Sequence, residues 1–439
     1  MSTLRSASVS ARQPRGSDGL SRRSHADESE VGRARALLAL ATQLSETGDR
    51  YGAVAAAVEA VGLYRRLAAT AGAAFLRALA SALNNLGTFQ NQAGDRDGAL
   101  ATGYETVATY RSLANSSPGD TLPELATSLN NLAAFQSASG DRQVALVTAQ
   151  EAASLYRSLA ASNPEAFTQD LAGSLNNLAN SQSEAGDRAA ALRTAQEAVS
   201  LYRTLATGNP QALTPDLASS LNNLANHQSK AGDRHAALAT AQEAVSLYRA
   251  IAAANPPAFT PDLAMSLNNL ANSQSEAGDR PAALDTAQEA VDLYRSLAKA
   301  NPQAFIPDLA GSLNNLANRQ SEAGDRPAAL STAHEAVTLR RALAQANPQA
   351  FTPDLATSLG AMAKILRALG RDGEATASFR EGVERITPFL LAYPAGFAGL
   401  ARALASDYVE VCEADGGEPD VELLRPVAEV LEALDGEGS

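Results

Sequence analysis

The chain repeats itself every 46 residues without an insertion or a deletion. The clearest marker is a glycine that precedes Asp-Arg, and its copies stand at Gly48, Gly94, Gly140, Gly186, Gly232, Gly278 and Gly324. Gly370 continues the series in the order Gly-Arg-Asp, and Gly416 falls on the next step. A fixed period of this length indicates one supersecondary unit stacked against copies of itself. The sequence therefore predicts eight units and a degraded ninth.

Residues 261–306 show how one unit folds. We expect Thr260 to cap a first helix that begins at Pro261, where a missing N–H costs nothing. Apolar residues then recur at helical spacing, at Leu263, Leu267, Leu270 and Ala271 in the first helix and at Ala283, Leu284, Ala287, Ala290, Val291, Tyr294 and Leu297 in the second. Gly278 ends the first helix, Asp279 caps the second, and Pro302 stops it. The unit is a hairpin of helices of about 17 and 20 residues.

The predicted fold is all-α, a right-handed α-solenoid of eight 46-residue helical hairpins with a degenerate C-terminal capping hairpin. We assign residues 1–30 to a disordered tail rich in Ser and Arg, and residues 399–439 to the acidic cap. The eight repeats are expected at 31–76, 77–122, 123–168, 169–214, 215–260, 261–306, 307–352 and 353–398.

Composition narrows the functional classes. The net charge is −13, and residues 401–439 alone carry eleven acids and two bases. The chain shows no basic stripe of the kind that phosphate recognition needs, so we expect no nucleic-acid partner. Cys412 is the single cysteine, and no apolar run approaches the roughly 18 residues of a membrane span. No phosphate-binding loop, nucleophile motif or metal motif appears, so we expect no enzyme activity, no cofactor and no metal.

The pattern L-x-x-L-A, then G-D, then A-L-x-x-A-x-x-A resembles the tetratricopeptide repeat. The wording "SLNNLA…GD…AL…EAV.LYR" with "NP.AF.PDLA" is similar to the long-helix repeats of kinesin light chains. It is also similar to arrays that accompany CHAT and NTPase domains in bacteria and fungi. The resemblance implies a superhelix whose first helices line a concave groove for protein partners.

Carrying the family's groove positions onto this sequence selects columns of asparagine. The first column comprises Asn84, Asn130, Asn176, Asn222, Asn268 and Asn314, and the third comprises Asn180, Asn226, Asn272 and Asn318. Glu184, Glu276 and Glu322 lie beside them, with Lys230 in the equivalent place of another unit. A second column, Asn85 to Asn315, follows the first directly and is the weaker candidate. Asparagine offers a donor and an acceptor, so such columns could bind the backbone of an extended peptide. Alternatively they satisfy neighbouring helices, and the glutamates are solvated.

Three other features leave alternatives open. Six units place Gln late in the first helix, from Gln90 to Gln320, where the family has a bulky residue. These amides either hydrogen-bond along the stack or mark a partly open edge. The Arg of each Gly-Asp-Arg turn is expected to pair with a nearby carboxylate or to stay solvated. His227 and His235 lie across one turn and are expected at the surface rather than on a metal.

The functional expectation is a cytoplasmic scaffold that binds a neutral to basic protein or peptide. One alternative is a regulatory or sensor subunit of a separate protease-like or NTPase effector, and another is a self-associating structural array. Exposed positions such as Gln182-Ser183-Glu184 recur as Gln274-Ser275-Glu276. Either recent duplication or a repetitive ligand explains this identity.

Overall fold

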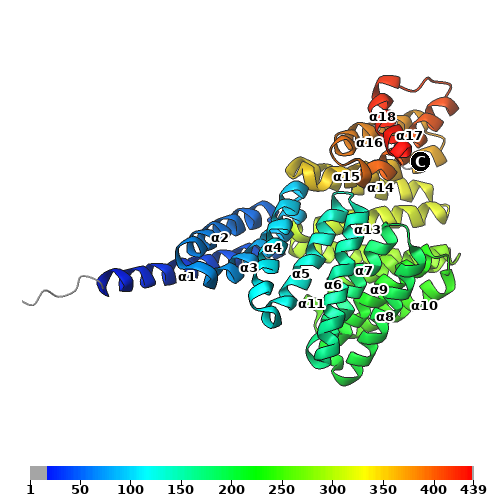
Figure 1. Cartoon of the computed structure of the whole chain (residues 1–439). Coiled ribbons are helices and arrows are strands. Elements are labelled where there is room, and N and C mark those ends of the chain that lie inside the picture. Colours follow the sequence, from blue (N-terminus) through cyan, green and yellow to red (C-terminus); the bar gives the residue numbers. More distant parts are fainter. Residues whose placement is uncertain (1–16, 438–439) are drawn as a thin grey trace, which may run out of the picture.

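The computed structural model describes residues 17–437, and every regular element in that range is helical. The helices are α1 (Ser17–Thr47), α2 (Arg50–Ala71), the short 3-10 helix η1 (Gly72–Phe75), α3 (Leu76–Ala93), α4 (Arg96–Ser116), α5 (Pro118–Ala138), α6 (Arg142–Ser162), α7 (Pro164–Glu184), α8 (Arg188–Gly208), α9 (Pro210–Lys230), α10 (Arg234–Ala254), α11 (Pro256–Glu276), α12 (Arg280–Ala300), α13 (Pro302–Glu322), α14 (Arg326–Ala346), α15 (Pro348–Ala368), α16 (Asp372–Ala392), α17 (Pro394–Ala414) and α18 (Val421–Glu437). The predicted all-α repeat solenoid is confirmed (Figure 1).

The turn inside each unit follows the prediction. Gly278 has φ of 91°, a left-handed conformation that glycine adopts without steric cost. Asp279 then caps α12, and its Oδ1 accepts a hydrogen bond from the Ala282 N–H at 3.2 Å. A side-chain cap of this kind contributes about 0.5–2 kcal/mol to helix stability. A left-handed glycine followed by aspartate separates the two helices in every unit from Gly48 to Gly324, although Asp141 makes no side-chain cap hydrogen bond.

The turn between units is shorter than predicted. Helix α11 begins at Pro256 and not at Pro261, and its N-cap is Asn255 rather than Thr260. One nonhelical residue, Asn301, closes α12 and caps α13, since Pro302 occupies the first helical turn. Pro261 lies inside α11, and its carbonyl accepts a hydrogen bond from the Tyr294 hydroxyl at 3.4 Å. Both helices of a typical unit therefore have 21 residues.

The stack has an inner and an outer layer. Successive odd-numbered helices from α3 to α17 lie against one another, whereas among the even-numbered helices of the described range only α16 and α18 come comparably close. The odd-numbered helices therefore line the inside of the curve. Each unit contributes a small core of Ala and Leu between its helices and the next unit, as Leu267 and Ala290 do, both fully buried.

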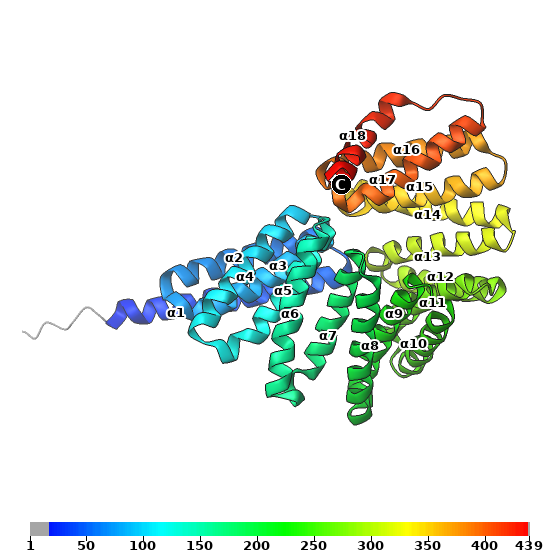
Figure 2. The same ribbon diagram turned by 45° about the vertical axis from the view of Figure 1, so that its right-hand side comes forward.

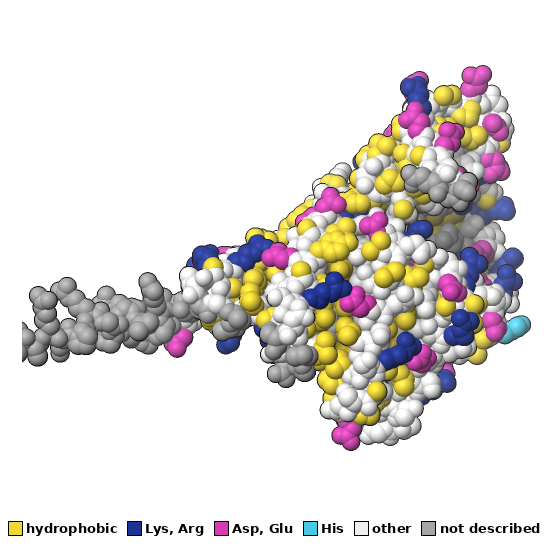
Figure 3. Space-filling view, in the orientation of Figure 1, with side chains coloured by type: hydrophobic (Ala, Val, Ile, Leu, Met, Phe, Trp, Pro, Cys, Tyr) yellow, Lys and Arg dark blue, Asp and Glu magenta, His cyan; other side chains and the backbone are white. Residues whose placement is uncertain are grey.

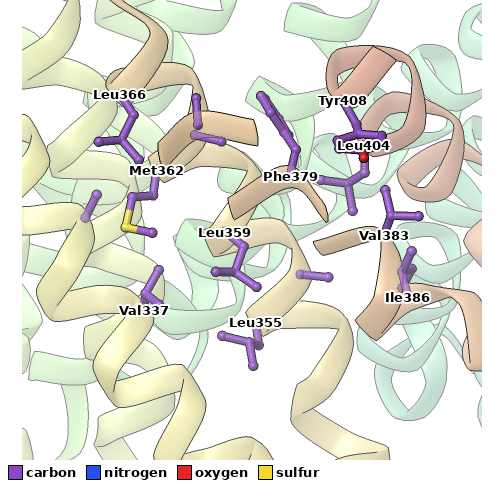
Figure 4. Close-up of a cluster of buried hydrophobic side chains, with 14 of the residues drawn as sticks. Val337, Leu355, Leu359, Met362, Leu366, Phe379, Val383, Ile386, Leu404 and Tyr408 are labelled. Carbon is purple, nitrogen blue, oxygen red and sulfur yellow. The ribbon is translucent and has the colours of Figure 1, made fainter. Parts of the chain in front are cut away.

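The C-terminal end holds the largest core cluster of the described residues. Phe379 from α16 is 1% exposed and packs with Leu359, Leu404 and Tyr408 from α15 and α17 (Figure 4). Val427 from α18 closes this cluster and is 1% exposed. Bulky side chains here replace the alanines of the central units, because the last unit has no further neighbour against which small residues could pack.

The superhelix contacts itself after one turn. Helix α1 lies against α13, and α3 against α15 (Figures 1 and 2). Gly48 approaches Gln303 and Ala304, Gly94 approaches Gln349 and Ala350, and Gly140 approaches Ala395 and Gly396. The two sides of each contact are separated by the same 255 residues of chain. We call this set of three contacts the seam.

Side chains reinforce the seam. The Arg50 guanidinium lies 4.5 Å from the centre of the Phe351 ring, and that of Arg96 lies 5.1 Å from the Phe397 ring. The Asn347 amide donates to the Ala93 carbonyl at 3.0 Å. Burial lowers the pKa of both Arg50 and Arg96. Arg50 also donates to the Gln92 carbonyl, and Arg96 to the Ala138 carbonyl, each in the following unit. The expectation that the arginine of a Gly-Asp-Arg turn pairs with a carboxylate or stays solvated is therefore wrong for Arg50 and Arg96.

Two further findings concern the ends and the surface. Helix α1 begins at Ser17, inside the range that we assigned to a disordered tail, and residues 1–16 lie outside the described part. Across residues 17–437, no helix has both the length and the apolar character to cross a bilayer.

Candidate functional site

The first asparagine column joins successive units on the inner layer. Ser220 of α9 donates to Asn176 Oδ1 of α7 at 3.0 Å, and Ser266 of α11 donates to Asn222 Oδ1 at 2.9 Å. Asn176 and Asn222 are only 9% and 3% exposed. The same bond recurs as Ser174 to Asn130 and as Ser312 to Asn268, both at 3.1 Å. These amide oxygens therefore hold the inner helices together.

At the two ends of this column the asparagines also bond to the neighbouring inner helix, but in a different way. Asn84 Oδ1 accepts from the Asn131 amide at 3.1 Å, and the Asn314 amide donates to Ser358 Oγ at 2.6 Å. Each such bond between neutral groups contributes about 0.5–1.5 kcal/mol to stability. Asn84, Asn130, Asn268 and Asn314 are half-buried. The first column thus has structural partners from one end of the array to the other.

A polar stripe runs along the inner layer next to this column and is most exposed in α7. In α7 it consists of Asn177, Asn180 and Glu184, which share one helix face at i, i+3 and i+7 and are all exposed. Together with Asn130 and Asn131 of α5 they line a cavity of about 420 Å³ between the two helices. Asn226 is also exposed, while Asn272 and Asn318 are half-buried. In the second column, which sequence reasoning ranked lowest, Asn177 is exposed and the other members, from Asn85 to Asn315, are half-buried.

The glutamates of the stripe reach back to the preceding unit. Glu184 accepts a hydrogen bond from Ser137 Oγ, and Glu276 from Ser229 Oγ. Glu322 accepts one from Ser275 at 2.6 Å and pairs with Arg319 at 3.0 Å. Lys230 takes the same place in α9 and donates to Ser183 Oγ at 3.3 Å. All three carboxylates stay exposed, so they keep acceptor capacity for a further cation or donor.

Of the two alternatives for the glutamine column, pairing along the stack is seen among the described bonds only at Gln136. Gln90 Oε1 accepts from Thr102 of its own unit at 2.8 Å, and the Gln136 amide donates to the Tyr104 hydroxyl at 3.2 Å. Among the described side chains, the Oε1 atoms of Gln136, Gln182, Gln228, Gln274 and Gln320 are buried without a hydrogen-bond partner. One reason is visible at Gln136: Thr148, the counterpart of Thr102, donates to the Val144 carbonyl of its own helix instead.

His227 is buried, in contrast to the expectation of a surface residue. It is 3% exposed, and neither ring nitrogen has a partner within the described range. Burial, with a smaller contribution from Lys230, lowers its pKa to about 4, so the ring is neutral near pH 7. His235 lies exposed across the turn. No group of three or more potential metal-ligating side chains occurs in the part of the chain that the structure describes.

The outer layer carries a regular series of ion pairs, the outer ladder, which the sequence analysis did not predict. An arginine late in each even-numbered helix from α2 to α14 pairs with a glutamate in the next even-numbered helix, always 40 residues further on. The seven pairs are Arg65–Glu105, Arg111–Glu151, Arg157–Glu197, Arg203–Glu243, Arg249–Glu289, Arg295–Glu335 and Arg341–Glu381. Figure 3 shows dark blue and magenta side chains side by side across this face. The recurrence of "YR" and "QEA" at a constant spacing was the available signal.

The outer ladder is expected to contribute little per rung. Arg203 and Glu243 are about half exposed and lie 2.7 Å apart, a setting in which solvent screens the attraction. A double-mutant cycle with Arg203→Ala and Glu243→Ala should give a coupling energy of about 0.2–1 kcal/mol from urea denaturation. A coupling well above that range would show that rungs reinforce one another along the ladder.

The comparisons with known proteins agree with the repeat architecture. Residues 171–206, 263–303 and 309–349 match a family model described as a tetratricopeptide repeat. No curated protein matches the chain in sequence.

Solved structures that resemble the chain include the following three. BtubC from P. vanneervenii is 19% identical, with a TM-score of 0.42, over 63% of this chain and 92% of that one. A putative kinesin light chain from Podospora anserina with nearly identical repeats is 17% identical, with a TM-score of 0.36, over 51% and 97%. A STAND signal transduction ATPase with a tetratricopeptide repeat sensor from Pyrococcus horikoshii is 13% identical, with a TM-score of 0.45, over 88% and 54%.

Proposed function

Because the chain is a tetratricopeptide repeat protein, we propose that it is a protein-interaction scaffold that binds an extended peptide along its inner layer. Tetratricopeptide arrays are typically non-catalytic and act by binding other proteins. The observation that carries the proposal is the exposed stripe of Asn177, Asn180 and Glu184 beside a 420 Å³ cavity. Amide side chains can pair with the backbone of a peptide whatever its sequence.

The proposal assigns different work to the asparagine columns. The second and third columns, represented by Asn177, Asn180 and Asn226, would contact the peptide backbone. The first column, represented by Asn176 and Asn222, would hold the helices in register behind them. Glu184, Glu276 and Glu322 would favour a basic or neutral segment, because they are exposed carboxylates on the same stripe.

The test compares two triple variants, one of the exposed asparagines and one of the first column. Asn177→Ala, Asn180→Ala and Asn226→Ala should weaken binding by at least about tenfold, because each removes a contact worth roughly 0.5–1.5 kcal/mol. The thermal midpoint should stay unchanged. Asn176→Ala, Asn222→Ala and Asn268→Ala should instead lower the thermal midpoint, because each leaves a serine hydroxyl without its acceptor.

The probe is an immobilised array of unstructured peptides in neutral, Lys-rich and Glu-rich series. Binding to the neutral and Lys-rich peptides is expected to exceed binding to the Glu-rich peptides. Equal binding by the wild-type protein and the Asn177, Asn180 and Asn226 variant would contradict the proposal. A preference for the Glu-rich series would contradict the proposed neutral to basic charge of the partner.

A further inference from the structure

The seam is built from two motifs, and the chain contains more copies of each motif than the seam uses. One is the Gly-Asp-Arg turn inside each unit, and the other is the Asn-Pro turn between units. The seam occupies the Gly-Asp-Arg turns at Gly48, Gly94 and Gly140. It covers them with the interunit turns at 301–305, 347–351 and 393–397. Further along the array both motifs recur with nearly the same residues but without this partner.

Burial separates the paired copies of the Gly-Asp-Arg turn from the unpaired ones. Gly140 is buried, and Gly48 and Gly94 are half-buried. Gly186, Gly232, Gly278 and Gly324 are all exposed, and a Cβ built on any of these four would meet nothing within 4 Å. In the seam, Arg50 and Arg96 are half-buried and Arg142 is exposed, whereas all four arginines of the unpaired turns are exposed: Arg188, Arg234, Arg280 and Arg326.

The interunit turns divide in the same way. Asn347 is 5% exposed, and its amide bonds to the Ala93 carbonyl across the seam. The equivalent Asn163, Asn209 and Asn255 precede the same proline and are exposed. The chain therefore carries two free edges: the Gly-Asp-Arg turns of its later units, and the Asn-Pro turns of its earlier units. Each free edge is complementary to the other, because their paired copies already bind each other.

We infer that the free Gly-Asp-Arg edge of one molecule docks against the free Asn-Pro edge of a second copy of this chain. The contact would continue the seam from one molecule to the next, with an arginine such as Arg280 over the aromatic ring of an interunit turn. Two different surfaces meet, so the association is head-to-tail and open-ended rather than a closed dimer. The cap formed by α17 and α18 covers the end of the helix stack and leaves this edge accessible.

The arrangement also explains the choice of residues at the free edge. A solvated turn needs glycine and a capping aspartate, but any residue could follow them. Arginine nevertheless follows at 188, 234, 280 and 326, as it does at 50 and 96 where it stacks on an aromatic ring. A guanidinium stacked on an aromatic ring is held more strongly when the contact is removed from water. Stacked copies would also align their inner layers into one continuous surface.

The test is sedimentation velocity of the full chain over a concentration series. The wild-type protein should show a sedimentation coefficient that rises with concentration. The variant Arg280→Glu with Arg326→Glu should remain monomeric, because both arginines lie on the free edge and outside the seam. Glutamate in the first turn of α12 and α14 suits the helix dipole, so the fold should be kept. Far-UV circular dichroism checks this point.

The matched control changes the same charge elsewhere. Arg35 and Arg193 are exposed and lie within helices, in neither set of turns, so Arg35→Glu with Arg193→Glu should associate as the wild type does. A mixture of the wild-type protein with the Arg280→Glu, Arg326→Glu variant gives a further readout. The variant keeps its Asn-Pro edge, so it should add to a wild-type assembly and stop its growth. A wild-type protein that stays monomeric at every concentration would overturn the inference. So would loss of association in the control variant, which would assign the effect to net charge.

Discussion

Replacing Phe379 by alanine is expected to lower the free energy of unfolding of the C-terminal units by about 3–5 kcal/mol. Phe379 is 1% exposed and lies among Leu359, Val383, Leu404 and Tyr408, which come from three helices (Figure 4). Removing the ring leaves a cavity that the surrounding helices can fill only in part, so packing contacts are lost along with the transfer free energy. The change should appear as a lower urea midpoint in circular dichroism.

The same helix supplies the control. Leu391 is also an apolar residue of α16, but its side chain is 56% exposed, so Leu391→Ala should leave the midpoint close to that of the wild-type protein. Because repeat arrays unfold in parts, hydrogen exchange should place the loss of protection caused by Phe379→Ala in α14 to α18. Equal midpoints for the Phe379 variant and the wild-type protein would refute the assignment of this cluster as the anchor of the C-terminal end.

Opening of the seam is the second large effect expected. A Cβ on Gly48, Gly94 or Gly140 would lie 2.5, 2.6 or 2.4 Å from a backbone atom of the facing turn. No side-chain rotation relieves such a contact, so the two turns of the superhelix must move apart. The triple variant Gly48→Ala, Gly94→Ala and Gly140→Ala should therefore show a larger radius of gyration in small-angle X-ray scattering.

The matched variant carries the same backbone strain without the collision. Gly186, Gly232 and Gly278 have φ of 93°, 87° and 91°, close to those of the seam glycines, and nothing lies within 4 Å of their added Cβ atoms. Alanine at these three sites should cost about 1–2 kcal/mol each through left-handed backbone, but the radius of gyration of the monomer, measured at low protein concentration, should not change. An equal expansion of both triple variants would show that strain in the turns, not contact across the seam, sets the shape.

The ladders give a physical reason for the similarity between units. Ser220 of one unit bonds to Asn176 of the unit before it, and Ser266 bonds in the same way to Asn222. Arg203 likewise pairs with Glu243 of the next unit. Each rung joins two different residue types from adjacent units, so every unit must carry both partners for the ladder to continue. This pairing accounts for recurring polar residues beyond what packing of Leu and Ala requires.

The sequence by itself determined the unit. Its period predicted helical hairpins, and Gly278 and Asp279 predicted the turn inside one, because left-handed backbone and capping are local properties of those residues. It misplaced the start of α11, because a proline such as Pro261 usually marks the first turn of a helix. In the structure Pro261 lies inside α11, and its carbonyl accepts a hydrogen bond from the Tyr294 hydroxyl. It selected the asparagine columns but could not tell which face each column occupies.

Only the tertiary structure decided how the units face one another and where the array meets itself. Asn176 is buried and Asn177 is exposed because of the rotation of each inner helix about its axis relative to the next helix. A rotation by one residue would exchange the burial of these two side chains. The contact of Arg50 with Phe351 depends on curvature that accumulates over many identical steps. A small rotation per unit, fixed by packing, is invisible in any one repeat and sets the shape of the whole.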